Sequence, residues 1–350
     1  MSGPRWNLGL GRRYWSPRLS RAPSMSPQPS PSTLPVTPAG VRQAAAERLA
    51  GRLVELTRDR ASTARAVACE CAAEIRDWAR AESAQWNRET MLRDLEEGWG
   101  EWCESHTWRG PCALFVDDLR GALAGSGDLR TALDLETSLW TREGGRGRLA
   151  DTAQVAAQAR ALLHPGDWVL VHGYSEPCIA ALVLAQEAGL APLVLLSEGA
   201  ADTSGKRMAR ELLSHGVRVR LGRDLATLAA IDEVDWVWLG SEALGAGCFV
   251  APLGSGLLLQ QARTAEVPTR VLATSSDLLP GGDVRLPAWG EKETEGLWSR
   301  APEGVELCAQ PFEFVATNSA DGWITEQGHE GFHELSLRAL RCTPHGDLRA

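Results

Sequence analysis

The chain has 350 residues, which is enough for one large domain or two ordinary ones with a substantial core. Its hydrophobic content of 44% and charged content of 23% are typical of a soluble globular protein. The net charge of -9 argues against a surface for nucleic acid or anionic membranes, and no apolar run approaches the roughly 20 residues of a membrane span. We therefore expect a cytoplasmic protein that binds neither nucleic acid nor membrane directly.

Residues 1–40 are rich in proline, serine and arginine, and the first acidic residue of the chain is Glu47. Without hydrophobic periodicity, this segment is predicted to be a disordered tail. Its composition also resembles an organellar transit peptide, although the prolines oppose the amphipathic helix that such peptides form. Translation that starts at Met25 is a further alternative.

Residues 41–147 show the periodicity of amphipathic helices and predict a helical N-terminal domain. Three apolar stripes recur at helical spacing, and Pro111 suits the first turn of a fourth helix. Further helical segments are expected over 128–143 and 151–163. The glycine-rich residues 144–147 are the best candidate for a domain boundary.

The eight cysteines are dispersed along the chain. Only Cys69 and Cys71 lie close together in the sequence, and side chains two residues apart on a helix face different directions. The spacing therefore predicts reduced thiols rather than disulfides or a metal site.

Residues 148–340 predict an α/β domain, because short apolar runs alternate with amphipathic segments after residue 164. The order is typical of a Rossmann-like parallel sheet with helices on both faces, and ligands of such sheets bind outside the C-terminal ends of the strands. The expected strands are 168–171, 192–196, 217–221, 236–239, 269–273 and, later in the chain, 312–315.

The turn after the first predicted strand contains Gly173, Tyr174 and Ser175. Ser175 is predicted to cap the next helix, with Pro177 in its first turn. The arrangement suits an anion cradle at a helix N-terminus, and it equally suits an ordinary turn that binds nothing.

Acidic residues follow three further strands. Glu198, Asp224 and Glu242 stand just beyond the C-terminal ends of neighbouring predicted strands, so their carboxylates are expected at one crevice. Gly254 and Ser255 form a turn into a helix at the same edge. This turn lacks the lysine of a P-loop and the full spacing of a dinucleotide-binding motif, so it supports no nucleotide assignment.

Residues 329–333 match the HExxH pattern of zinc proteases. That chemistry needs both histidines on one face of a regular helix, whereas Gly328 and Gly331 weaken any helix here. We interpret the match as coincidental and expect neither a metal nor a cofactor.

The order of these motifs resembles the superfamily of translation initiation factor 2B alpha, beta and delta subunits, methylthioribose-1-phosphate isomerase and ribose-1,5-bisphosphate isomerase. Residues 169–175 (VLVHGYS) are similar to its first-strand turn in the initiation-factor form, and 325–328 (TEQG) are similar to its C-terminal signature. Residues 234–244 and 247–254 follow in the family's order. The resemblance implies a helical N-terminal domain followed by a Rossmann-like, NagB/RpiA-like α/β domain.

Several positions depart from the isomerase pattern. Where the isomerases have a cysteine after the histidine of the first turn, this chain has Gly173, and their catalytic aspartate falls at Glu242. The arginine that follows the second strand in the family falls at Ala200, and an Asn-Lys pair falls at Ala251 and Pro252. An isomerase needs a paired acid and base, and cations for the substrate phosphate.

The resemblance to the initiation-factor branch therefore implies a non-catalytic protein, a pseudoenzyme. It would form a homodimer or larger homo-oligomer through its C-terminal domain and keep a pocket for a sugar phosphate or nucleoside monophosphate. The alternative is a divergent aldose–ketose isomerase of a phosphorylated pentose, with Glu242 as acid or base and with Cys178 or Cys248 in place of the missing thiol. The expected ligand contacts are Gly173, Tyr174, Ser175, Glu198, Asp224, Gly254 and Ser255.

Overall fold

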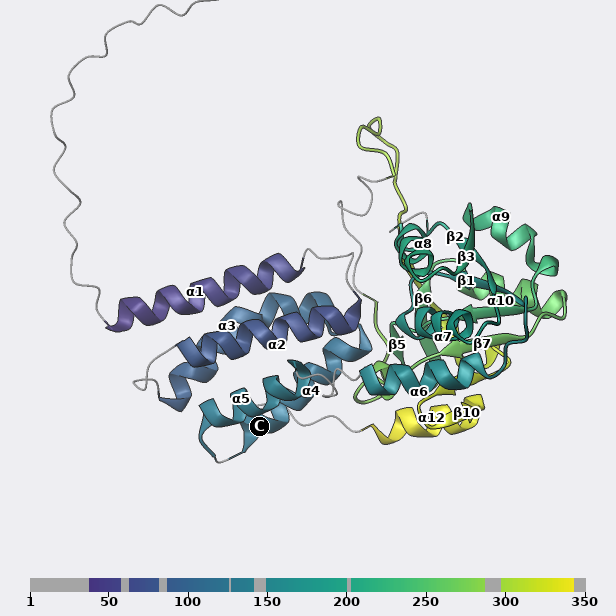
Figure 1. The fold of residues 1–350 in the computed structure, drawn as a ribbon. Helices are drawn as coiled ribbons and strands as arrows, with labels where there is room; N and C mark the ends of the chain where they lie inside the picture. Colours follow the sequence, from purple (N-terminus) through teal and green to yellow (C-terminus); the bar gives the residue numbers. More distant parts are fainter. Residues whose placement is uncertain are drawn as a thin grey trace, which may run out of the picture.

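The computed structural model describes residues 38–57, 63–81, 87–125, 127–141, 149–199, 203–286 and 297–342. The predicted tail lies almost wholly outside these residues, as do the predicted boundary at 144–147 and Ala200. A part made of helices α1–α5 and a part built around the sheets lie side by side in the fold (Figure 1).

The helical part confirms the helices predicted from the apolar stripes, including Pro111 in the first turn of α4. Its core contains large aromatic side chains, and Phe115 packs edge-on against both Trp102 and Trp140 with ring centroids 6.2 and 5.4 Å apart. The helices are α1 (Pro38–Thr57), α2 (Ala64–Ala81), α3 (Arg88–His106), α4 (Gly110–Ala124) and α5 (Leu129–Thr141).

A seven-stranded sheet with the order β10-β9-β7-β4-β1-β2-β3 forms the centre of the α/β part. All its neighbouring strands are parallel except β9 and β10, which pair antiparallel. The strands are β1 (Trp168–His172), β2 (Leu193–Ser197), β3 (Arg218–Gly222), β4 (Trp236–Leu239), β7 (Thr269–Leu272), β9 (Trp323–Thr325) and β10 (Gly328–Glu330).

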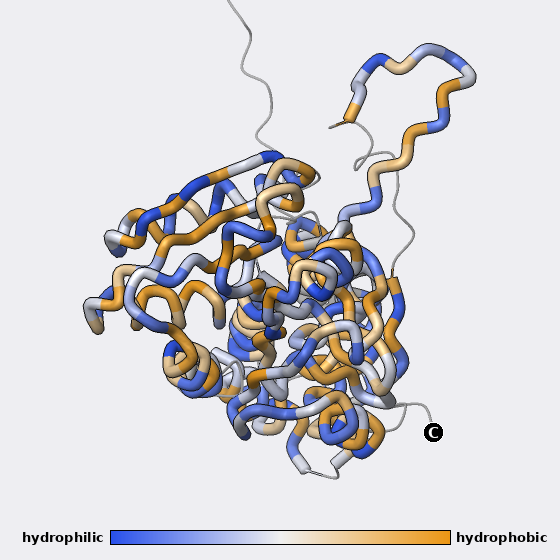
Figure 2. Tube along the Cα trace, turned by 90° about the vertical axis from the view of Figure 1, so that its right-hand side faces the viewer, coloured by the Kyte–Doolittle hydropathy of each residue, from blue (hydrophilic) through white to orange (hydrophobic). Residues whose placement is uncertain are grey.

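Helices cover both faces of this sheet, as predicted. On one face α6, α7 and α8 pack against side chains such as Val171 and Trp238, and on the other α10 and α12 pack against side chains such as Leu170 and Leu239. Hydrophobic and hydrophilic residues are interspersed along the trace (Figure 2), and the central strands are buried along almost their whole length. The helices are α6 (Leu149–Arg160), α7 (Glu176–Glu187), α8 (Ser204–Ser214), α9 (Asp224–Ala229), α10 (Ser255–Thr264) and α12 (Phe332–Arg341).

A second, three-stranded sheet is antiparallel and has the order β5-β6-β8, with β5 (Ala243–Leu244), β6 (Cys248–Pro252) and β8 (Phe312–Ala316). The strand at 312–315 was therefore predicted correctly, but its expected place in the parallel sheet is wrong. The connections between β4, β5 and β6 are only a few residues long, and a parallel neighbour needs a crossover of a dozen or more. The chain therefore turns back from β5 into β6 as an antiparallel hairpin, and β8 extends this hairpin by pairing with β6.

The strand order changes direction at β1. After β1 the chain adds β2 and β3 on one side of it and then returns to add β4 and β7 on the other. Such a switch leaves a crevice between the connections that follow β1 and β4. Among the helices that the structure describes, none is both long and apolar enough to cross a membrane.

Candidate functional site

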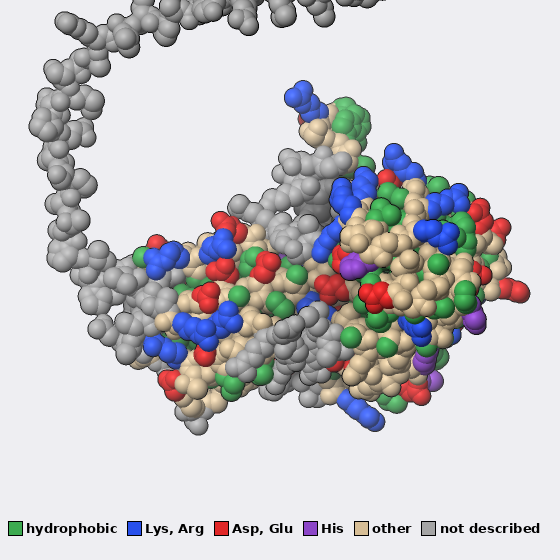
Figure 3. All heavy atoms as spheres, in the orientation of Figure 1, with side chains coloured by type: hydrophobic (Ala, Val, Ile, Leu, Met, Phe, Trp, Pro, Cys, Tyr) green, Lys and Arg blue, Asp and Glu red, His purple; other side chains and the backbone are tan. Residues whose placement is uncertain are grey.

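A pocket opens at this switch point, between the turns that follow β1 and β4. It has about 430 Å³ of empty volume, part of it open solvent. The start of α2 (residues 63–65) closes it from the helical part, opposite residues 174–177 and 240–242. Acidic side chains gather where the two parts meet (Figure 3).

The turn after β1 forms as predicted, because Ser175 caps α7 and its hydroxyl accepts a hydrogen bond from the Cys178 N–H at 3.4 Å. The end of β4 lies directly against this cap. A Cβ atom on Gly240 would lie 2.7 Å from the Cβ of Ser175, so only glycine fits between them. This close approach brings Ser241 and Glu242 to the mouth of the turn.

His172 fixes the neighbouring turn in place. Its Nε2 lies 3.0 Å from the Leu253 carbonyl, which can only accept, so Nε2 carries the proton and donates. Its Nδ1 lies 2.5 Å from the Ser197 hydroxyl. His172 is thereby committed to holding the turn before α10 against β1 and β2, rather than facing a ligand.

Gly173 adopts φ +82°, and the Pro252 side chain fills the space that a Cβ atom on it would occupy. Two departures from the isomerase pattern, the missing cysteine and the missing lysine, are therefore in contact with one another. No side chain fits at residue 173 while Pro252 stays where it is.

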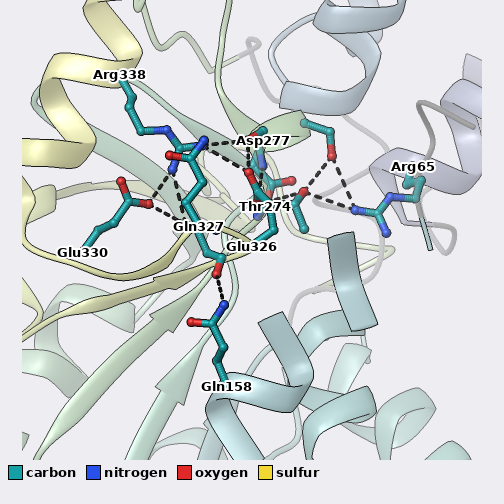
Figure 4. A network of polar contacts seen from close by, with 11 residues as sticks. Arg65, Gln158, Thr274, Asp277, Glu326, Gln327, Glu330 and Arg338 are labelled. Atoms are coloured by element: carbon teal, nitrogen blue, oxygen red, sulfur yellow. Dashed lines mark hydrogen bonds and ion pairs between the residues drawn. The ribbon is translucent and has the colours of Figure 1, made fainter. Parts of the chain in front are cut away.

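Arg65 reaches into the pocket from α2 and is only 9% exposed. Its Nη2 donates to the Thr274 and Ser276 hydroxyls at 3.3 and 3.4 Å, and its Nη1 donates to the Thr152 hydroxyl. Its acidic partner is Glu176, with Nη1 3.4 Å from Oε2. These contacts tie the helical part to three segments of the α/β part, and Figure 4 shows the one to Thr274.

Glu242 makes a buried ion pair with Arg109, whose Nε lies 2.9 Å from Oε2, and the two side chains are 19% and 8% exposed. The Gly110 N–H at the start of α4 also donates to the Glu242 carbonyl at 2.8 Å. Glu242 thus lies at the pocket, as predicted, but its carboxylate is held by the N-terminal end of α4.

Asp277 is the third acid of the pocket, and it belongs to a short 3-10 helix, η2 (Ser275–Asp277). Its carboxylate accepts a hydrogen bond from the Thr274 N–H at 2.6 Å. Burial raises the pKa of Asp277 to about 7, despite the nearby positive charge of Arg65.

Behind η2, Arg338 of α12 contacts two buried acids, Glu326 at 3.2 Å and Glu330 at shorter range, and donates to the Ser275 hydroxyl at 2.6 Å. The side chains of the two acids are only 11% and 10% exposed. A continuous polar network therefore runs from α12 through η2 to Arg65 in the helical part (Figure 4).

The structure brings Tyr174, Ser175 and Glu242 together at one pocket, with Gly173 in the adjoining turn. Tyr174 donates to Glu211 at 2.6 Å, and burial raises the pKa of its hydroxyl. Its ring lies against the Arg207 guanidinium at 3.9 Å.

The other predicted ligand contacts lie outside this pocket. Glu198 pairs with Arg223 at 3.2 Å, and Asp224 accepts a hydrogen bond from the Gly199 N–H at 3.0 Å. The turn that contains Gly254 and Ser255 begins α10 and is occupied by a carboxylate from β8, described below. The expectation that all these residues meet in one crevice is thus only partly met.

The HExxH match does not form a zinc-protease site. His329 and Glu330 lie in β10 and His333 lies in α12, so the histidines do not share a helix face. Within the described residues, no group of three or more histidine, cysteine, aspartate or glutamate side chains is placed to hold a metal.

Sequence reasoning missed Arg65, Arg109 and Asp277. The two arginines belong to helices far from the predicted sheet edge, and Asp277 follows β7 by five residues. A signal for Asp277 was present, because a carboxylate after a fourth parallel strand belongs to the same edge as the others.

Comparison with known families supports the resemblance. The family model described as "Initiation factor 2 subunit family" matches residues 146–329. Ribose 1,5-bisphosphate isomerase of Methanocaldococcus jannaschii is 26% identical over 167 residues, which are 47% of this chain and 54% of the relative. Translation initiation factor eIF2B subunit alpha of Dictyostelium discoideum is 29% identical over 123 residues, 35% and 38% of the two chains. The chain thus spans about half or less of the length of these relatives.

Solved structures confirm the fold class. Translation initiation factor eIF-2B of Pyrococcus horikoshii has a TM-score of 0.67 and 20% identity, covering 81% of this chain and 96% of that one. The 5-methylthioribose 1-phosphate isomerase of the same organism has a TM-score of 0.63 and 17% identity, covering 85% and 87%. Factors and isomerases share the architecture, so the fold alone does not decide between the two functions.

Proposed function

Because the chain belongs to the initiation factor 2 subunit family, we propose that it is a non-catalytic protein of the initiation-factor-2B type whose role is protein association. The observation that carries the proposal is the contact between Gly173 and Pro252. The position of the isomerase cysteine is empty of a side chain here and is blocked by a neighbour. Catalysis of this kind tolerates little displacement of the reacting groups.

Neither candidate substitute for the missing thiol supports catalysis. Cys178 is fully buried, its Sγ faces the Leu239 carbonyl at 3.8 Å, and burial raises its pKa to about 12. A thiol with that pKa stays protonated and unreactive at neutral pH. Cys248 lies on β6, and neither cysteine lines the pocket.

Association is supported by apolar side chains on a projecting arm, residues 297–311, which extends away from the α/β part (Figure 1). Leu297, Trp298 and Val305 on the arm are 60%, 50% and 45% exposed, and Phe314 on the adjoining β8 is 51% exposed. Exposed apolar groups that gather on one element are characteristic of interaction sites. The partner we propose is a second copy of the chain, bound through the α/β part.

A divergent isomerase is the second candidate, and one observation favours it. Asp277 and Glu242 line the same pocket, and the pKa of Asp277 is raised to about 7 while Glu242 is held by a cation. A carboxyl group whose pKa lies near neutrality, beside a second carboxylate in the same pocket, suits acid–base catalysis.

Turnover separates the two candidates. We expect no ketose from ribose-1,5-bisphosphate or methylthioribose-1-phosphate at micromolar protein. Turnover by the wild type that is abolished in both Glu242→Gln and Asp277→Asn would establish the isomerase. Loss in neither variant would identify a contaminating enzyme.

The predicted pocket ligand, a sugar phosphate or nucleoside monophosphate, stays a prediction. The described lining offers it one arginine and three carboxylates, Arg65 against Glu176, Glu242 and Asp277. Thermal-shift titration with both ligand classes tests it, since a ligand that binds only the folded state raises Tm. No shift at millimolar concentration leaves a purely structural or interaction role.

A further inference from the structure

Three helices of the molecule begin at the pocket. The lining includes Thr63 and Arg65 at the start of α2, Pro111 at the start of α4, and Ser175 to Pro177 at the start of α7. A helix N-terminus carries partial positive charge and free N–H groups, which makes it suited to bind anions. The starts of these three helices and the Arg65 guanidinium together form a site suited to an anion, which we call the anion-binding corner.

The carboxylate of Glu176 already occupies that corner. Glu176 lies in the first turn of α7, and its Oε1 accepts a hydrogen bond at 2.7 Å from the hydroxyl of Thr63, which also caps α2 by accepting from the Ala66 N–H at 3.2 Å. Its Oε2 faces Arg65 at 3.4 Å. The Glu176 carboxylate therefore lies at the N-terminal ends of both α2 and α7 and pairs with one buried cation.

The N-terminal end of α10 is likewise bound by a carboxylate of the chain itself. The N–H groups of Gly254 and Gly256 both donate to one carboxylate oxygen of Glu313, at 3.0 and 2.8 Å. Glu313 comes from β8, more than fifty residues further along the chain. The glycine turn that the sequence offered as a phosphate-adjacent site is thus filled by an acid of the chain itself.

Arg65 shows that the corner depends on Glu176 for its charge balance. Its side chain is nine-tenths buried, and its Nε–H has no hydrogen-bond partner among the described residues. Its remaining partners are the neutral hydroxyls of Thr152, Thr274 and Ser276. If Glu176 is removed, the guanidinium loses its ion-pair partner and remains buried, with only the nearby Asp277 carboxyl to offset its charge, and a poorly compensated buried charge is costly.

We propose that Glu176 is a built-in substitute for an anionic ligand. It occupies the corner in which a phosphate or carboxylate group of a ligand would bind, and it connects the helical part to the α/β part without any ligand. Wild-type protein would therefore exclude anions from this corner. The inference rests on the proposed function in one respect, that the pocket no longer handles a phosphorylated substrate.

The test is a thermal-shift titration of the full chain with inorganic phosphate, with sodium chloride at equal ionic strength as the reference. Phosphate stabilises folded proteins generally, so the matched control is Glu187→Ala, which removes an exposed acid from the other end of the same helix. Glu176→Ala is expected to melt below wild type in chloride. Phosphate should then raise its Tm saturably, by about 2 °C more than in wild type or Glu187→Ala at a tenfold excess over the dissociation constant.

Two further variants make the result specific. Glu176→Ala combined with Arg65→Met should lose the saturable part of the shift, because the buried cation is gone. If the alanine variant does not fold, Glu176→Gln takes its place in the test. Glu176→Gln keeps an acceptor for Thr63 but not the charge, and it should show a smaller phosphate effect than is expected for Glu176→Ala. An equal shift in wild type and Glu176→Ala, or no saturable shift in a variant with a native circular dichroism spectrum, would overturn the proposal.

The proposed function fails by different measurements. Turnover of a sugar phosphate or a monomeric wild type would contradict that proposal, whereas a folded Glu176→Ala protein without a saturable phosphate shift would overturn only the inference about Glu176.

Discussion

The Pro252 side chain lies in the space that a Cβ atom on Gly173 would need, and Gly173 itself adopts φ +82°. The strand β6 thus approaches the turn after β1 so closely that residue 173 cannot carry a side chain. Glycine at residue 173 and proline at residue 252 are therefore one structural feature rather than two. A cysteine at residue 173 would not fit unless Pro252 also changed.

We predict that Gly173→Ala destabilises the protein by about 2–4 kcal/mol, the sum of a left-handed backbone conformation and overpacking against Pro252. Gly166 provides the control, because it has φ +84° but open space around its Cβ position. Gly166→Ala should therefore cost only about 1–2 kcal/mol. Urea denaturation measures both. Adding Pro252→Ala should recover part of the Gly173→Ala loss, and equal losses for the two glycine variants would contradict the contact.

The ion pair between Arg109 and Glu242 connects the helical part to the pocket. We predict that Arg109→Met destabilises the protein by about 3 kcal/mol, because it leaves the largely buried Glu242 carboxylate without its cation. Arg52, which pairs with Glu55 where both side chains are 59% and 63% exposed, is the control. Arg52→Met should cost less than about 1 kcal/mol. If denaturation gives similar losses, the Arg109 pair does not stabilise the junction between the parts.

The sequence allowed the parallel strands to be predicted, since β1 and β4 are continuous apolar runs that are buried on both faces. It also placed Glu242 and Ser175 correctly, because both follow directly from the end of a strand. It could not place Arg65 at the pocket, since the hydroxyls that hold Arg65 come from segments 87 and about 210 residues away. The capture of the α10 turn by Glu313 was equally hidden, because it depends on β8 pairing with β6 rather than joining the large sheet.

Arg338 compensates two buried acids at once. We predict that Arg338→Met costs about 3–5 kcal/mol, because Glu326 and Glu330 then remain buried without a cation. Arg341, on the same helix and exposed, is the matched control, and Arg341→Met should change stability by less than about 0.5 kcal/mol. Replacing Glu326 and Glu330 by glutamine in the Arg338→Met background should recover part of the loss. Equal stability of the two arginine variants would refute this account of the network.

Asp277 makes stability depend on pH. Burial raises its pKa from 3.8 to about 7, so the folded chain binds an extra proton between these values, and stability falls as the pH rises through that window. Asp277→Asn should therefore gain roughly 3 kcal/mol relative to wild type between pH 4 and pH 8. Urea midpoints at several pH values measure the difference.

The control for this pH effect is Asp128, for which the sign is opposite. Hydrogen bonds from Thr131 lower the pKa of Asp128, so its contribution is lost as the pH falls. Asp128→Asn should cost stability only above about pH 4. A flat difference between wild type and Asp277→Asn would show that Asp277 titrates normally.

The projecting arm provides the test of association. Trp298 is 50% exposed on a segment without a core of its own, so burial against a second copy is the interaction that would cover it. We predict that the wild type sediments as a dimer or larger species at micromolar concentration. Trp298→Ser should shift it toward monomer. At protein concentrations where association adds little to stability, the substitution should leave Tm within about 2 °C of the wild-type value. Leu225→Ser, which changes a 75% exposed leucine on α9, should leave the oligomer intact. A monomeric wild type would rule out self-association, whereas an oligomeric Trp298→Ser protein would place the interface elsewhere than on the arm.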